Sequence, residues 1–151
     1  MTPISVRLAE GEDAATVAVL VHALLDELSG GKAPTVEEIT ERAKAVLSET
    51  GVVAVIACAD DAPIGVMTLN ECSAIYAGGK FGEISELYVR PEARSKGIAQ
   101  QLLDRAQQEA RARGWKRIEV GAPGQPEWHR TLNFYLRNGF EEVGPRLRRL
   151  V

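Results

Sequence analysis

Residues 84–103 read ISELYVRPEARSKGIAQQLL, and this stretch decides the fold. Its apolar beginning continues a strand that we expect over Phe81–Val89, and Pro91 then stops the strand because proline cannot donate to a ladder. The amphipathic pattern that follows predicts a helix from Gly97 to Arg113. The stretch therefore predicts a strand, a short basic loop and a long helix in direct succession.

The loop between the predicted strand and helix has the features of an anion site. N–H groups in the first helical turn lack intrahelical partners, and the helix dipole places partial positive charge there. Arg94 and Lys96 add formal charge, and Gly97 removes a side chain where a ligand could approach. The P-loop and dinucleotide patterns are both absent. An ordinary basic surface loop is the alternative to a phosphate site.

Hydrophobic periodicity predicts the other elements along the chain. A helix begins at Asp13 and ends at Gly30-Gly31, and Thr35 opens a second helix that runs to about Glu49. The order of the elements indicates an α/β fold with a mixed sheet and helices on both faces. The remaining expected strands are Ile4–Leu8, Val52–Ala59, Ile64–Tyr76, Lys116–Val120, Phe140–Gly144 and Leu147–Val151, and the last helix is Glu127–Asn138.

Composition restricts the class of protein further. The 151 residues are 45% hydrophobic and 26% charged, which fits a single domain over residues 1–151. The net charge of −3 does not favour nucleic-acid binding, and no apolar run reaches the roughly 20 residues that a membrane span needs. Two cysteines and two histidines make a metal site unexpected. We expect a soluble, cytoplasmic protein without a membrane or nucleic-acid partner.

Two separated motifs resemble the GNAT superfamily of N-acetyltransferases: ELYVRPEARSKGIAQQLL at Glu86–Leu103 and FYLRNGF at Phe134–Phe140. The family's loop pattern, Arg or Gln-x-x-Gly-x-Gly or Ala, is matched by Arg94, Gly97 and Ala99. The resemblance implies a mostly antiparallel mixed sheet flanked by about four helices and splayed between the two middle strands. It also implies that acetyl-CoA is the anion and the co-substrate.

The resemblance assigns cofactor contacts to one continuous part of the chain. Main-chain groups of the strand would bind the pantetheine arm, and backbone groups of the loop would bind the pyrophosphate. The Val89 N–H is the candidate to polarise the thioester carbonyl. The residues expected to hold acetyl-CoA are Leu87, Tyr88, Val89, Arg94, Ser95, Lys96, Gly97, Ile98, Ala99 and Gln100.

The chain departs from the family pattern at one cofactor position. Many members carry Asn seven residues before the helix tyrosine, where Trp128 stands here, and often Ala four before, where Thr131 stands. Asn133 lies on a different face of the predicted helix and does not replace the missing amide. The backbone cradle does not depend on this position.

Two glutamates of the predicted strand are candidates for the base that deprotonates the amine. Glu83 and Glu86 stand where glutamate is disfavoured, and the alternative is that they point into a solvated groove. Strand alternation places Glu83 on one face with Leu87 and Val89, and Glu86 on the other. This alternation favours Glu83, although a bulge between the two would change the faces.

Tyr135 matches the family tyrosine that protonates the departing thiolate, and its alternative is a core aromatic with a hydrogen-bonded hydroxyl. Cys58 could accept an acetyl group in a ping-pong route, but an apolar strand favours a small buried residue there. We expect direct attack by a small-molecule primary amine in a ternary complex. Protein or peptide acetylation and a non-catalytic acyl-CoA sensor are the alternatives, and the family implies a homodimer as a candidate assembly.

Overall fold

The computed structural model of the protein describes residues 2–122 and 128–151. The chain forms two compact units, residues 1–119 and residues 120–151. A single domain over the whole chain stays a prediction. The predicted helix start at Glu127 lies outside the described residues.

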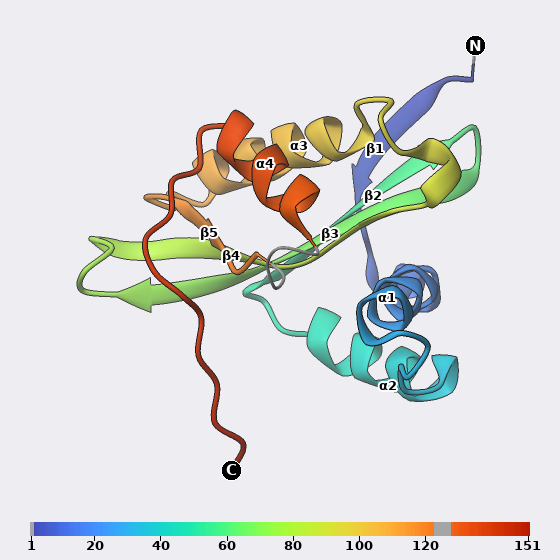
Figure 1. Ribbon diagram of the computed structural model, residues 1–151, viewed down its shortest axis with the longest axis horizontal. Helices are drawn as coiled ribbons and strands as arrows, with labels where there is room; N and C mark the ends of the chain where they lie inside the picture. Colours follow the sequence, from blue (N-terminus) through green and yellow to red (C-terminus); the bar gives the residue numbers. More distant parts are fainter. Residues whose placement is uncertain (1, 123–127) are drawn as a thin grey trace. The chain divides into compact units, whose positions relative to one another are not determined.

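The sheet has five strands in the order β1-β2-β3-β4-β5, and its first three pairings are antiparallel (Figure 1). Before β5, the Lys116 N–H donates to Lys80 O (2.9 Å), and the Gly82 N–H donates to Arg117 O (3.0 Å). From the first bond to the second, the residue number rises on both segments, so the two segments run parallel. The strands are Ile4–Leu8, Val52–Ala59, Ala62–Ala74, Gly79–Val89 and Ile118–Val120.

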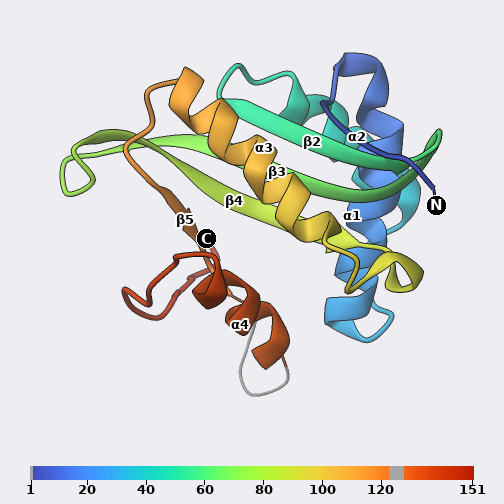
Figure 2. The same cartoon turned by 90° about the horizontal axis from the view of Figure 1, so that it is seen from above.

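Helices cover both faces of the sheet in the first unit. Figure 1 shows α1 and α2 on one face and α3 on the opposite face, and Figure 2 gives the same arrangement from above. The described helices are α1 (Ala14–Ser29), α2 (Val36–Leu47), α3 (Ile98–Ala112) and, in the second unit, α4 (His129–Arg137). A mixed five-stranded sheet with these four helices confirms the predicted fold class.

The predicted helix signals have the expected geometry. Gly30 is left-handed (φ 69°) at the end of α1. Thr35 caps α2 by accepting a hydrogen bond from the Glu38 N–H at 3.2 Å. The periodicity of apolar residues thus located the helices, and the caps located their ends.

The core on the α1 face joins that helix to the three central strands. Leu20 packs with Ile56 and Tyr88 in one buried cluster. On the opposite face, Gly65 permits close approach of α3, because a Cβ there would lie 3.3 Å from Leu102 Cδ1. Both faces of β2 and β3 are consequently buried, which explains the continuous apolar run in β2.

The expected strands Phe140–Gly144 and Leu147–Val151 are wrong, because residues 140–151 form no regular element. Val143 is 78% exposed and Leu147 is 88% exposed. Their short apolar alternation does not suffice for a strand, since a strand needs a neighbour to satisfy its main-chain groups.

Asp13 should make the stability of the first unit pH-dependent. Its carboxylate accepts two hydrogen bonds from Arg7 (2.7 and 2.9 Å) and one from the Glu10 N–H (2.8 Å). These bonds lower the pKa of Asp13 to about 2, and the side-chain hydrogen bonding with Arg7 is the largest cause. A carboxyl with a lowered folded-state pKa contributes stability above its unfolded pKa of about 3.9, and loses it as pH falls towards about 2.

We therefore expect Asp13→Asn to lower the free energy of unfolding near neutral pH by about 1–2 kcal/mol, since Arg7 is half exposed and partly screened. Urea denaturation over a pH series measures the difference. It should shrink as the wild type is acidified, and a pH-independent difference would contradict this account.

Candidate functional site

The loop before α3 has an unusual backbone. Ser95 has a φ of 64° and Gly97 a φ of 79°, so two left-handed residues flank Lys96. All three are exposed, whereas Ile98 is buried at the first position of α3. Such a succession of turns directs neighbouring N–H groups into a concavity that can bind an anion.

Gly97 is suited to this loop for two reasons. Its φ is one that residues with a side chain rarely adopt, and a Cβ added there would meet no atom within 4 Å. The space above it is therefore open towards a ligand. The N–H groups of the first turn of α3, which have no partner within the helix, lie beside it, so the residues present fit a phosphate group.

Arg94 is engaged with the protein itself. Its Nε donates to Val89 O (2.8 Å), one Nη donates to Glu27 of α1 (2.8 Å), and its guanidinium lies 5.5 Å from the centre of the Tyr88 ring. Arg94 thereby connects the loop to the end of β4 and to α1. Lys96 is the exposed cation between the two left-handed residues.

The end of β4 presents main-chain groups away from β3. The Arg90 N–H donates to Ile64 O at 2.8 Å, so it points towards β3. Because successive N–H groups of a strand alternate in direction, those of Val89 and Leu87 point towards the opposite side. The hydrogen bonds near Lys80 and Gly82 place the three-residue β5 against the beginning of β4 on that side.

A β-bulge lies between the two candidate glutamates. Leu69 pairs with Ile84 and the adjacent Thr68 pairs with Glu86, so Ser85 is the extra residue of β4. The bulge reverses the alternation of faces that a regular strand would have.

The predicted face of Glu83 is therefore wrong, whereas the predicted position of Glu86 on the face opposite to Leu87 and Val89 is confirmed. Glu83 pairs with Asn70 and Glu86 with Thr68, and these partners, two residues apart, share one face of β3. Both glutamates thus lie on the face of Tyr88, opposite to Leu87 and Val89. The bulge removes the reason for preferring Glu83, and the two carboxylates stand as equal candidates.

Glu86 has a defined partner in Thr68. The Thr68 hydroxyl donates to Glu86 Oε1 and accepts a hydrogen bond from the Glu86 N–H at 3.0 Å. Glu83 is half-buried. The pKa of the Cys72 thiol is raised, first because the thiol is partly buried and second because the negative charge of Glu83 lies nearby. Sequence reasoning missed Thr68, whose only signal is a hydroxyl inside an apolar strand.

Tyr135 lies in α4 of the second unit. It is 4% exposed, and its ring makes edge contacts with Phe134 and Phe140 at centroid distances of 5.3 and 5.2 Å. Burial raises the pKa of Tyr135, so the hydroxyl keeps its proton at neutral pH. Trp128, at the position of the missing family Asn, is half-buried at the N-cap of α4.

The two cysteines occupy different environments. Cys58 is buried in the apolar cluster of the α1 face, which favours its interpretation as a small core residue.

Within residues 2–122 and 128–151 no group of three His, Cys, Asp or Glu side chains could hold a metal ion. No helix of that part of the chain is long and apolar enough to cross a bilayer.

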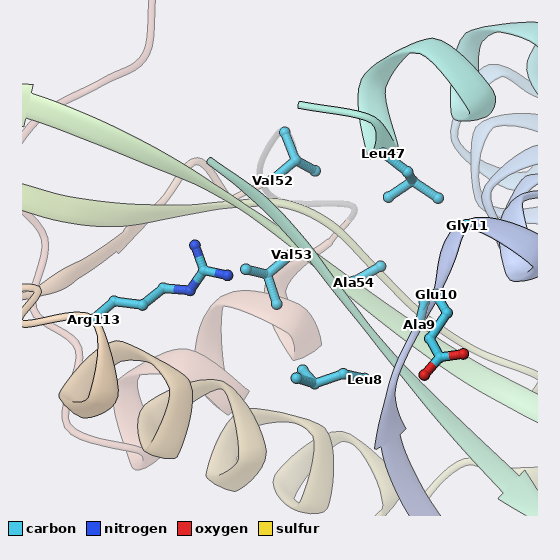
Figure 3. Close-up of a pocket in the computed structure, with 9 residues that line it drawn as sticks. All are labelled: Leu8, Ala9, Glu10, Gly11, Leu47, Val52, Val53, Ala54 and Arg113. Atoms are coloured by element: carbon cyan, nitrogen blue, oxygen red, sulfur yellow. The ribbon is translucent and has the colours of Figure 1, made fainter. Parts of the chain in front are cut away.

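A small pocket of about 110 Å³ lies where β1 ends and β2 begins (Figure 3). Arg113, just past the C-terminal end of α3, extends towards Val53 and donates to Thr50 O at 3.2 Å. The pocket is thus near the opposite end of α3 from Gly97. Its lining residues are Leu8, Ala9, Glu10, Gly11, Leu47, Val52, Val53, Ala54 and Arg113.

Comparison with known proteins identifies the family to which the chain belongs. The family model described as "Acetyltransferase (GNAT) family" matches residues 20–140. The chain therefore belongs to the GNAT acetyltransferase family, as its two motifs predicted. It is an acetyl-CoA-dependent N-acetyltransferase. No curated protein matches the chain.

Solved structures share the fold at low sequence identity. A ribosomal-protein-alanine N-acetyltransferase from Brucella melitensis is 23% identical (TM-score 0.76), with 99% of this chain and 100% of that chain covered. An aminoglycoside N-acetyltransferase crystallised with CoA is 17% identical (TM-score 0.80; 100% and 96% covered). A transcriptional regulator from Bacillus halodurans is also 17% identical (TM-score 0.82; 99% and 100% covered). These likenesses establish the fold and leave the acceptor open.

The buried state of Tyr135 can be measured directly. We expect its hydroxyl to ionise at a higher pH than tyrosine in an unfolded chain, because burial disfavours the charged phenolate. An alkaline titration followed by tyrosinate absorbance should show this late step in the wild type. The step should vanish in Tyr135→Phe, and its persistence would contradict the assignment.

Proposed function

We propose that the protein transfers the acetyl group of acetyl-CoA to a primary amine of a small molecule, by direct attack in a ternary complex. The observation that carries the proposal is the exposed left-handed loop at Ser95–Gly97, placed between the end of the bulged β4 and the start of α3. This geometry offers backbone donors to a pyrophosphate and main-chain groups to an extended arm.

The proposed cofactor contacts follow the chain. N–H groups of Ser95–Gln100 bind the pyrophosphate, with Lys96 as the neighbouring charge. Main-chain groups of Leu87–Val89 bind the pantetheine arm as an added strand would. Arg94 lies beside the pyrophosphate and also holds the loop against Val89 O and Glu27.

Bound acetyl-CoA supplies an activated acetyl thioester. For the chain's own residues, we assign proton removal from the amine to Glu83 or Glu86, which share the α1 face of β4. The Val89 N–H donates towards the reacting carbonyl oxygen, and Tyr135 delivers a proton to the departing sulfur. Burial keeps the Tyr135 hydroxyl protonated when turnover begins, which is the state that an acid requires.

A small amine is the proposed acceptor. The acceptors named for related structures indicate which other substrates to include in a test. One acts on a ribosomal protein and another on aminoglycosides. A screen of small amines, aminoglycosides and peptides, followed by release of free CoA thiol, separates these acceptors. A reducing cytoplasm suits the two free cysteines, and homodimer formation remains part of the proposal.

The cofactor loop can be tested without an acceptor. Acetyl-CoA at about 100 times its Kd should stabilise the protein by about 2.7 kcal/mol and raise its Tm. Gly97→Glu should abolish this shift, because it adds bulk and negative charge in the open space above the loop. Differential scanning calorimetry with acetyl-CoA, NAD and ATP measures the effect.

Gly114→Glu is the matched control. Gly114 also has a positive φ (72°) and open space, but it lies at the other end of α3. The control should retain the acetyl-CoA shift, although it carries similar backbone strain. A full shift in Gly97→Glu would move the cofactor site elsewhere.

Tyr135→Phe tests the acid. We expect kcat to fall by about 10²-fold with the acetyl-CoA Tm shift intact, since only the hydroxyl is removed. Tyr76→Phe is the control, because Tyr76 lies on the β3–β4 turn and is 67% exposed. Steady-state release of CoA with the best amine decides the outcome, and an unchanged kcat in Tyr135→Phe would reject its role.

A further inference from the structure

Thr68 is a polar residue in an apolar setting. It lies in the middle of β3, is 5% exposed, and shares the α1 face with Val66. On the neighbouring strand β2 it pairs with Ala54, which belongs to the buried cluster. A hydroxyl in such a place requires a hydrogen-bond partner, because burying it alone is unfavourable.

The partner is Glu86, and the bonding assigns the proton. The Glu86 N–H can only donate, so the Thr68 oxygen accepts from it at 3.0 Å. The hydroxyl hydrogen then remains for Glu86 Oε1, to which Thr68 donates. One hydroxyl therefore binds both the main chain and the carboxylate of the same residue.

This double contact occurs at the bulge of β4. Bulges commonly re-aim a side chain, and the extra residue Ser85 places Glu86 opposite Thr68. A glutamate side chain otherwise samples many rotamers and loses much freedom on ordering. Thr68 restricts Glu86 both at its main chain and at its carboxylate.

We propose that Thr68 is a positioning residue, whose hydroxyl holds the carboxylate of Glu86 in place to receive the proton of the acceptor amine. The inference rests on the proposed function and selects Glu86 over Glu83 as the base. In the step, an N–H bond of the protonated amine breaks and the proton moves to a Glu86 carboxylate oxygen. The freed nitrogen lone pair then forms the bond to the acetyl carbon, the carbon–sulfur bond of the thioester breaks, and the leaving sulfur takes the proton of Tyr135.

Thr68→Val and Thr68→Ser test the hydroxyl separately from the side-chain volume. Thr68→Val should lower kcat by about 10- to 100-fold with KM for acetyl-CoA unchanged, since a misplaced base affects the chemical step. Thr68→Ser should restore most of kcat because it keeps the hydroxyl. Thr40→Val is the control: the Thr40 hydroxyl donates to Val36 O within α2, and its loss should leave kcat unchanged.

A spectroscopic measurement keeps the test independent of turnover. In the wild type and Thr68→Ser, the Glu86 amide should be protected from hydrogen exchange, and Glu86 should show one χ1 rotamer by NMR couplings. Both properties should be lost in Thr68→Val while circular dichroism and Tm report a folded protein. Their retention in Thr68→Val would overturn the proposal.

A double-mutant cycle identifies the residue through which Thr68 acts. Thr68→Val should add no further loss of kcat to Glu86→Gln, but it should add its full loss to Glu83→Gln. The reverse pattern would overturn the selection of Glu86. Wild-type protein that releases no CoA with any amine would refute the proposed function itself, whereas an active wild type with equal kcat in Thr68→Val refutes only the inference.

Discussion

The register between β3 and β4 is the constraint on which the site in the first unit depends. It brings Gly65 opposite Val89 and Thr68 opposite Glu86, and it places Glu83 opposite Asn70. The single extra residue, Ser85, decides which side chains face α1 and which face α3. At the end of β4, strand alternation points the N–H groups of Leu87 and Val89 away from β3.

A second constraint connects the loop to the elements around it. Arg94 bonds to Val89 O and to Glu27, while Ile98 is buried under the first turn of α3. The exposed backbone between these two anchors is held in a conformation that is unfavourable for Ser95, which has a positive φ. Local strain is tolerated here because the neighbouring contacts determine the path of the chain.

Much of this could be predicted from the sequence, and the limits have physical causes. The apolar stripe of α1, the cap at Thr35 and the Pro91 stop are local signals, so the elements were located correctly. The bulge at Ser85 depends on the pairing of two strands, which no local pattern reveals. The same holds for the Thr68–Glu86 contact, 18 residues apart in sequence. The C-terminal strands were wrong because apolar alternation cannot supply a pairing partner.

Gly65 has a consequence beyond its own strand. Its missing Cβ lets the first turns of α3 lie close to the sheet, with Leu102 and Ile98 directly above it. The height of that helix over β3 fixes how far the left-handed loop stands from the end of β4. A methyl group at Gly65 would press on Leu102 and on the main chain of β4 at Tyr88, and would thereby alter the distance between α3 and the end of β4.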